Sequence, residues 1–167
     1  MSDLHVSWDQ YHESIERLAV ALRDSKWEFN QIICIARGGM RIGDVLSRIF
    51  KLPLAIISTQ SYVGEAGSER GELTVARHMT MSTAALGGSV LLVDDLVDSG
   101  ITLDVVKRHL FGEFPTIREI RTAVLWYKAC SNYVPDYYVS YLTESPWIHQ
   151  PFEKYDLMKP QDLPAEP

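Results

Sequence analysis

Two adjacent carboxylates are the strongest chemical signal in the chain. Asp94 and Asp95 directly follow the apolar run SVLLV at 89–93. A run without polar alternation is typical of a strand that is covered on both faces of a parallel sheet. Carboxylates at the end of such a strand are costly unless they have partners. The pair therefore indicates a site for sugar hydroxyls, which donate to carboxylates, or for Mg²⁺, which prefers oxygen ligands.

The segment after the carboxylates predicts a cradle for an anion. Asp98, Ser99 and Gly100 form a loop, and a helical pattern begins at Ile101. Backbone N–H groups and the dipole at a helix N-terminus favour phosphate. Gly100 allows a phosphate to approach the backbone, while the Ser99 and Thr102 hydroxyls add donors. The order of strand, acid pair and cradle predicts a ligand that carries a phosphate monoester. The alternative is an ordinary connection in which Asp98 only caps the helix.

The patterns on either side of this segment predict an α/β fold. Ser7 and Gln10 fit a capping box, and apolar residues follow at helical spacing. The expected elements are a helix at 8–24, a strand at 31–36, a helix at 40–50, strands at 54–58 and 89–93, a helix at 101–110 and a strand at 117–127. Strands that alternate with helices are typical of parallel sheets. The polar, glycine-bearing stretch at 59–88 predicts a long functional loop, with a surface insertion as the alternative.

Length and composition limit the function. The 167 residues suit one domain, expected over 1–159 with a frayed tail at 160–167. The net charge of -6 and the lack of a basic stretch argue against nucleic-acid binding. The N-terminus has no signal pattern, and the apolar runs are too short for a membrane span. The two cysteines give no disulfide framework, and the five histidines show no metal-ligand spacing. We expect a cytoplasmic protein.

Several motifs together resemble a known family. VLLVDDLVDSGIT at 90–102 resembles the phosphoribosyl-pyrophosphate signature of the type I phosphoribosyltransferases, and ARGG at 36–39 resembles their pyrophosphate loop. Ser61 and Tyr62 resemble the start of the mobile catalytic loop. WIHQPFE at 147–153 is similar to the purine-covering hood of the bacterial xanthine-guanine enzymes, as HVSWDQYH at 5–12 is to their opening. The resemblance implies a parallel sheet of four or five strands flanked by helices, with a small hood from 128–159.

The resemblance also implies a reaction and binding roles. The enzyme would transfer the 5-phosphoribosyl group to a 6-oxopurine with Mg²⁺ and release pyrophosphate. Arg37 and the N–H groups of Gly38 and Gly39 would bind pyrophosphate, in a loop that often carries a cis peptide bond. Asp95 and Asp94 would bind ribose hydroxyls or Mg²⁺, with the division between them open. The phosphate cradle would consist of Ser99, Gly100, Ile101 and Thr102.

The same resemblance supplies a base pocket. Asp98 would take the purine proton, and Lys128 would face the 6-oxo oxygen. A solvated lysine at a strand end is the alternative for Lys128. Trp147 would stack on the base, and the backbone at Ile148 would meet the 2-position. His149 has no assigned role beyond packing or the pocket rim.

One departure and two alternatives remain. Gly71 stands where the xanthine-guanine enzymes carry an arginine, which leaves open whether Arg70 or Arg77 contacts pyrophosphate. The fold also serves regulators that sense phosphoribosyl pyrophosphate or nucleotides, and enzymes for a non-purine base. Members of the family are commonly homodimers or homotetramers, so we expect a homo-oligomer.

Overall fold

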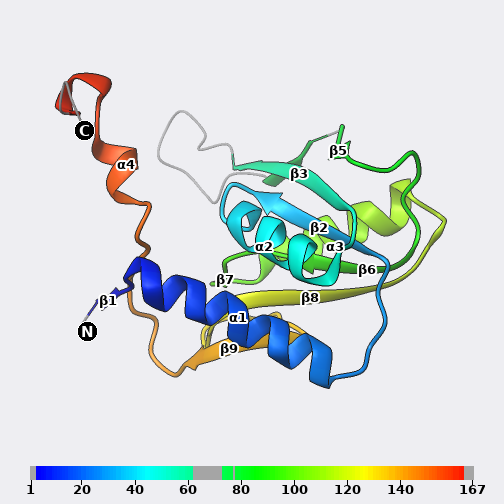
Figure 1. The fold of residues 1–167 in the computed structure, drawn as a ribbon, viewed down its shortest axis with the longest axis horizontal. Coiled ribbons are helices and arrows are strands. Elements are labelled where there is room, and N and C mark those ends of the chain that lie inside the picture. Colours follow the sequence, from blue (N-terminus) through cyan, green and yellow to red (C-terminus); the bar gives the residue numbers. More distant parts are fainter. Residues whose placement is uncertain (1–2, 62–72, 77, 164–167) are drawn as a thin grey trace.

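A parallel sheet between two helical layers organises the protein (Figure 1). The structure is a computed structural model that describes residues 3–61, 73–76 and 78–163. The short strand β7 (Leu96–Val97) pairs parallel with β8, and the longer parallel strands run in the order β3, β2, β6, β8 and β9. Their bounds are Leu54–Ser61, Gln31–Ala36, Gly88–Val93, Ile117–Lys128 and Tyr137–Leu142. The predicted fold class is therefore confirmed.

Alternating side chains of the strands enter two separate cores. Ile32, Cys34 and Leu91 pack with α1 (Trp8–Asp24) and α2 (Met40–Phe50) on one face. Ile33 and Leu92 pack with α3 (Ile101–Glu113) on the other. Successive residues of a strand point to opposite faces, which explains why these strands are apolar throughout their length.

The helices begin and end close to the predicted residues. The α1 helix begins after the expected capping box: the Gln10 N–H donates to Ser7 Oγ at 3.2 Å, and the Ser7 N–H donates to Gln10 Oε1 at 2.9 Å. Its buried stripe includes Tyr11, Ile15 and Leu18. The α2 helix has the predicted bounds, and α3 continues three residues beyond the predicted end at 110. No helix among the described residues is long and apolar enough to cross a membrane.

The stretch expected as a long loop is partly sheet. The β3 strand extends to Ser61, and two short strands pair antiparallel with it: β4 (Leu73–Val75) and β5 (Thr80–Met81). Pairing with β3 satisfies the backbone N–H and C=O groups of these short strands. The polar composition of the stretch gives no sign of this pairing. The expected mobile loop with Tyr62, and both Arg70 and Arg77, lie outside the described residues.

The hood combines the two ends of the chain. The β1 strand (Leu4–His5) pairs parallel with β10 (Ile148–His149). The chain then extends away from the sheet through α4 (Lys154–Leu157) and a 3₁₀ turn at Pro160–Asp162 (Figure 1). The β9 strand, which falls within the range expected for the hood, pairs with β8 in the main sheet.

The strand order creates a topological switch point between β2 and β6. The chain leaves β2 through α2 to β3 on one side, and it leaves β6 through α3 to β8 on the other. Ligands of open α/β sheets bind at the carboxyl ends of the strands at such a point. The two loops pack closely here, because a Cβ atom on Gly39 would collide with the Val93 carbonyl oxygen and lie 3.1 Å from Asp94 Cα.

Candidate active site

The two carboxylates lie where β6 ends, and their oxygens are already oriented. The Asp95 N–H donates to Asp94 Oδ1 at 2.9 Å, and the Leu96 N–H donates to Asp95 Oδ1 at 2.8 Å. The other Asp95 oxygen accepts from Gln150 Nε2 in the hood. These donors hold both carboxyl groups in place and leave lone pairs on their oxygens for a further ligand.

The environment of Asp94 disfavours the charged form of its carboxyl group. Burial of the Asp94 carboxyl, together with the negative charge of Asp95, raises the pKa of Asp94 well above its usual range. Hydrogen bonds from the backbone N–H groups of Asp95 and Gly39 offset part of this rise. Asp94 is therefore poorly placed to carry negative charge toward a ligand.

The loop after β2 brings Arg37, Gly38 and Gly39 against these acids. The Ala36–Arg37 peptide bond is cis, as the resemblance implies. A Cβ atom on Gly38 would lie 2.6 Å from the Asp95 carboxylate, so only glycine leaves room here. The Arg37 guanidinium is exposed and lies 3.3 Å from Asp156 Oδ1. The hood thus contacts this loop through an ion pair that sequence reasoning did not foresee.

A second arginine joins this loop. Arg41, in the first turn of α2, lies with Arg37, Asp95 and Gln150 around a hollow of about 360 Å³. Its guanidinium stands over the ring of Phe152 at 4.1 Å. Sequence reasoning missed Arg41. Its place in the first turn of the helix that follows Arg37 could have indicated that the two arginines lie close together. Gln150 and Asp156 gave no signal, because only the hood's return to the sheet brings them here.

The predicted phosphate cradle forms a separate hollow of about 220 Å³. It is lined by residues 94–100 together with Thr102 and Leu103. Gly100 has φ +85° and is the N-cap residue directly before α3, and a Cβ atom there would collide with Tyr133. The residue at the helix cap is thus Gly100, and the alternative of Asp98 as the cap is wrong. Asp95 lines both this hollow and the one beside Arg37.

Lys128 is the buried cation of the site. Its side chain is 9% exposed, and Nζ lies 3.4 Å from Asp98 Oδ1. The alternative of a solvated lysine is therefore wrong, because Lys128 belongs to β8 and points inward at the end of that strand. Cys130 lies beside the same acid, with Sγ 3.5 Å from Asp98 Oδ1.

Trp147 of the hood lies on a different hollow. Trp147 is 64% exposed and shares a space of about 550 Å³ with His5, His149 and Gln150. Ile148 is buried as a whole and pairs with Leu4 across β1 and β10. The structure brings Asp94, Asp95, Arg37 and the cradle together around one edge, but it does not bring Trp147 into the hollow that Asp98 lines.

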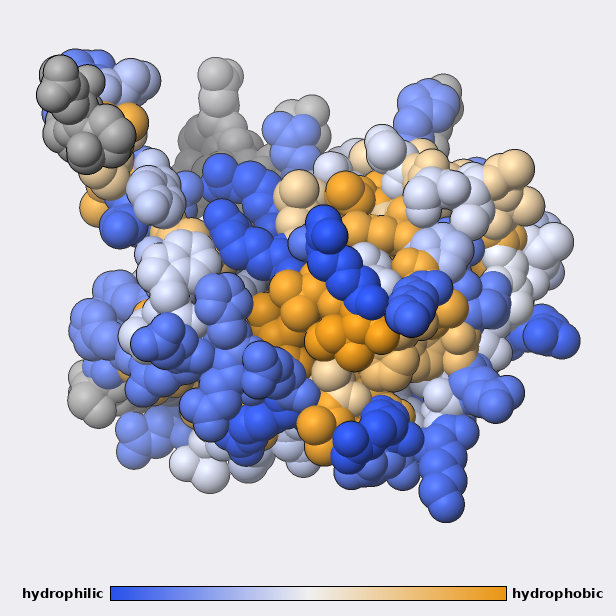
Figure 2. Space-filling view, viewed as in Figure 1, coloured by the Kyte–Doolittle hydropathy of each residue, from blue (hydrophilic) through white to orange (hydrophobic). Residues whose placement is uncertain are grey.

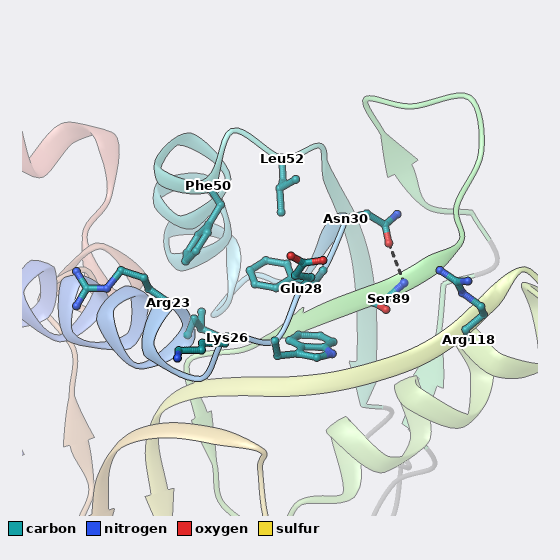
Figure 3. Close-up of a pocket in the computed structure, with 11 residues that line it drawn as sticks. Arg23, Lys26, Glu28, Asn30, Phe50, Leu52, Ser89 and Arg118 are labelled. Atoms are coloured by element: carbon teal, nitrogen blue, oxygen red, sulfur yellow. Dashed lines mark hydrogen bonds between the residues drawn. The ribbon is translucent and has the colours of Figure 1, made fainter.

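Another hollow, of about 700 Å³, lies at the opposite end of the strands (Figure 3). The side chains around it include Arg23, Lys26 and Arg118, and Asn30 Oδ1 accepts from the Ser89 N–H at 2.7 Å. None of the predicted site residues lines it. It begins where β2 and β6 start, away from the switch point.

Thiol labelling tests the difference in burial between Cys34 and Cys130. Burial raises the pKa of Cys34 to about 11, which keeps its thiol protonated and unreactive, whereas Cys130 is exposed. We expect iodoacetamide at about pH 8 to label Cys130 alone in the native chain and both cysteines after unfolding. Mass spectrometry of tryptic peptides measures this. Equal labelling of Cys34 in the native protein would contradict it.

Comparison with known proteins agrees with this architecture. Residues 7–156 match the model of the phosphoribosyl transferase domain family. A xanthine-guanine phosphoribosyltransferase of Gluconobacter oxydans is 31% identical over 162 residues, which cover 96% of this chain and 90% of the relative. A purine phosphoribosyltransferase from Pyrococcus horikoshii superimposes with a TM-score of 0.76 at 30% identity, covering 95% and 99% of the two chains. The xanthine-guanine-hypoxanthine enzyme of Helicobacter pylori superimposes with a TM-score of 0.74 at 25% identity, covering 93% and 96%.

The chain belongs to the phosphoribosyltransferase family. It is an enzyme of that class, and the predicted family is confirmed.

Proposed function

We propose that this enzyme transfers the 5-phosphoribosyl group from phosphoribosyl pyrophosphate to guanine, xanthine or hypoxanthine. The products are the nucleoside monophosphate and pyrophosphate. The observation that carries the proposal is the buried Lys128 ammonium 3.4 Å from Asp98, beside an anion cradle at the switch point. The named 6-oxopurine activities of the Gluconobacter and Helicobacter relatives support it.

The two hollows that meet at Asp95 suit the two anionic ends of the sugar substrate. We assign the 5-phosphate to the cradle, where Ser99, Thr102 and the backbone at Gly100 and Ile101 would donate to it. We assign pyrophosphate to the hollow beside Arg37, Gly38 and Gly39. Asp95 would then accept from the ribose hydroxyls between them. Holding the two anions apart prepares the sugar for loss of pyrophosphate from C1.

Arg41 would be a further cation for pyrophosphate. It lines the same hollow as Arg37, and the Phe152 ring beneath its guanidinium holds it in place. The ion pair between Arg37 and Asp156 must open for Arg37 to bind pyrophosphate. Exposed ion pairs are weak, about 0–1 kcal/mol, so a polyanion can displace Asp156.

The residues present fit Mg²⁺. Asp95 offers a carboxyl group with oriented oxygens, and Asp94 lies next to it. Mg²⁺ is bound in proteins by one or two carboxylates together with substrate oxygens and water. We propose Asp95 as the main holder and Asp94 as the second. When bound, Mg²⁺ would offset the charge on the departing pyrophosphate.

The base would lie over Lys128 and Asp98. Lys128 Nζ would donate to the 6-oxo oxygen, and Asp98 would accept the purine proton as the glycosidic bond forms. In the free enzyme these two groups form an ion pair with each other. Trp147 would cover the base by stacking, which requires the hood to move toward Asp98. The backbone at Ile148 would meet the 2-position.

The expected role is purine salvage in the cytoplasm by a homo-oligomer. The face in Figure 2 exposes an apolar area beside α2. Val20 on α1 and Ile49 on α2 are each about half exposed and line a hollow of about 380 Å³. Exposed apolar patches of this kind often mark protein contacts. A second copy of the chain would cover this one.

Product analysis tests the proposed function. We expect pyrophosphate and nucleoside monophosphate in equal amounts from phosphoribosyl pyrophosphate, Mg²⁺ and guanine, and no reaction with orotate or uracil. The substrate and the nucleotide product should also slow labelling of Cys130, because they would cover Asp98. A salt-sensitive gel shift of RNA or DNA without turnover would instead support a regulator of the same fold.

A further inference from the structure

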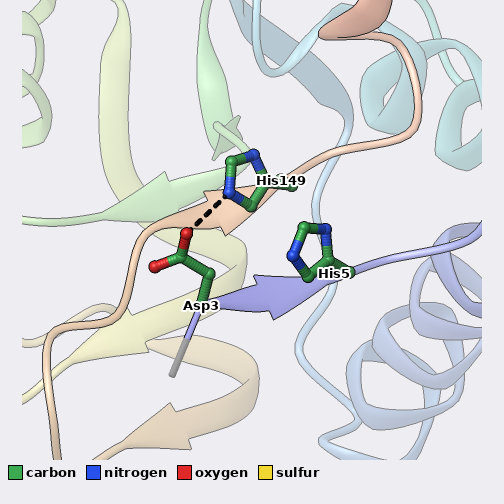
Figure 4. A group of neighbouring side chains, drawn as sticks. All are labelled: Asp3, His5 and His149. Atoms are coloured by element: carbon green, nitrogen blue, oxygen red, sulfur yellow. Dashed lines mark hydrogen bonds and ion pairs between the residues drawn. The ribbon is translucent and has the colours of Figure 1, made fainter. Parts of the chain in front are cut away.

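Two histidines and an aspartate meet where the ends of the chain pair. Asp3 and His5 come from the N-terminus and His149 from the hood, as Figure 4 shows. His5 and His149 are direct neighbours across the β1–β10 pair, with stacked rings whose centroids are 4.4 Å apart. One ligand atom from each of the three residues lies within 4.8 Å of the others.

From this juxtaposition we infer that Asp3, His5 and His149 bind a transition-metal cation such as Zn²⁺. Two imidazoles and a carboxylate are a usual donor set for zinc, with bonds of about 2.0–2.2 Å. Tetrahedral coordination places neighbouring donor atoms about 3.4 Å apart. His149 Nε2 and Asp3 Oδ2 are already 2.9 Å apart. Rotation of the three side chains would then bring all three donor atoms to coordination distance of one cation without movement of the strands.

The surroundings of His149 support a ligand role. Its Nε2 faces Asp3, while its other ring nitrogen, Nδ1, faces Glu153 Oε2 at 3.9 Å. A carboxylate near the second nitrogen is the usual way in which proteins orient a metal-binding histidine. Asp3 and His5 are exposed and His149 is half-buried, so a cation and a water ligand can reach the cluster from solvent.

This site would differ from the proposed Mg²⁺ site in place and in chemistry. Magnesium favours oxygen ligands and binds imidazole poorly, whereas zinc accepts nitrogen readily. Zinc bound here would also clamp β1 to the hood. The Leu4 N–H donates to the Trp147 carbonyl at 2.8 Å, and the Val6 N–H donates to the His149 carbonyl at 3.0 Å. The metal would therefore stiffen the backbone beside Trp147.

Calorimetry with ZnCl₂ tests the inference on the full chain in a large excess of Mg²⁺. A Cys130→Ser background removes the exposed thiol as a competing ligand. We expect one Zn²⁺ per chain, and binding weakened at least about 100-fold by His5→Ala and by Asp3→Asn. His12→Ala is the matched control, because His12 lies nearby on α1 outside the cluster and should bind zinc like the background protein.

Hydrogen exchange gives a second measurement that does not depend on catalysis. Zinc should slow exchange of the Leu4 and Val6 amides in the background protein, and it should leave them unchanged in the His5→Ala variant. The inference is overturned if the background protein binds no zinc. It is also overturned if His5→Ala and Asp3→Asn both bind zinc as tightly as the background does. Either result leaves the proposed transferase function untouched.

Discussion

Asp98→Asn is expected to lower kcat with guanine by about 10²–10⁴-fold, the usual contribution of a positioned general base. The amide keeps the shape of the side chain but cannot take the purine proton. Asp98 lines the cradle, and removal of its negative charge there should not weaken the binding of phosphoribosyl pyrophosphate. Single-turnover kinetics separates the chemical step from product release.

Asp104→Asn is the matched control for this variant. Asp104 is an exposed aspartate in the first turn of α3 and pairs with Arg108 at 2.7 Å, outside the cradle. Its replacement removes the same charge near the same helix and should leave kcat within about twofold, as expected for a surface ion pair. Equal kcat values for Asp98→Asn and the wild type would rule out Asp98 as the base.

Adenine is expected to react about four orders of magnitude less efficiently than guanine, measured as kcat/KM. Lys128 has three donors and no acceptor, so it suits a 6-oxo group and leaves a 6-amino group unpaired. The ammonium is almost fully buried, and Asp98 is its one ion-pair partner among the described residues. A buried charge that loses a partner is costly, which makes the discrimination large.

Lys128→Met should reduce this preference. The substitution keeps an unbranched side chain, removes the donor, and should lower kcat/KM for guanine by about 10²-fold through loss of a charged hydrogen bond. Adenine should lose much less, so the ratio of the two bases falls. Lys107→Met, at a half-buried position of α3 that lines neither hollow of the site, is the control and should keep the wild-type ratio. An unchanged ratio in Lys128→Met would place the 6-position elsewhere.

The main elements of the fold could be predicted because their signals are local. The Ser7–Gln10 capping box, the apolar spacing of α1 and the unbroken apolar strands all act over a few residues. The short strands β1, β4, β5 and β7 were not predicted. Two or three residues carry no readable period, and these strands exist only because a partner lies beside them.

The acid pair and the cradle loop at the end of β6 could be located from the sequence, because they are contiguous in the chain. The long-range partners of that segment depend on the tertiary fold. Gln150 reaches Asp95 across 55 positions, and Asp3 reaches His149 across 146. Long-range partners of this kind depend on how the sheet and hood fold back, and no local propensity encodes them. The burial of Lys128 also depends on the tertiary fold. The sequence shows only a lysine at the end of a strand, and the packing of β8 against its neighbours encloses it.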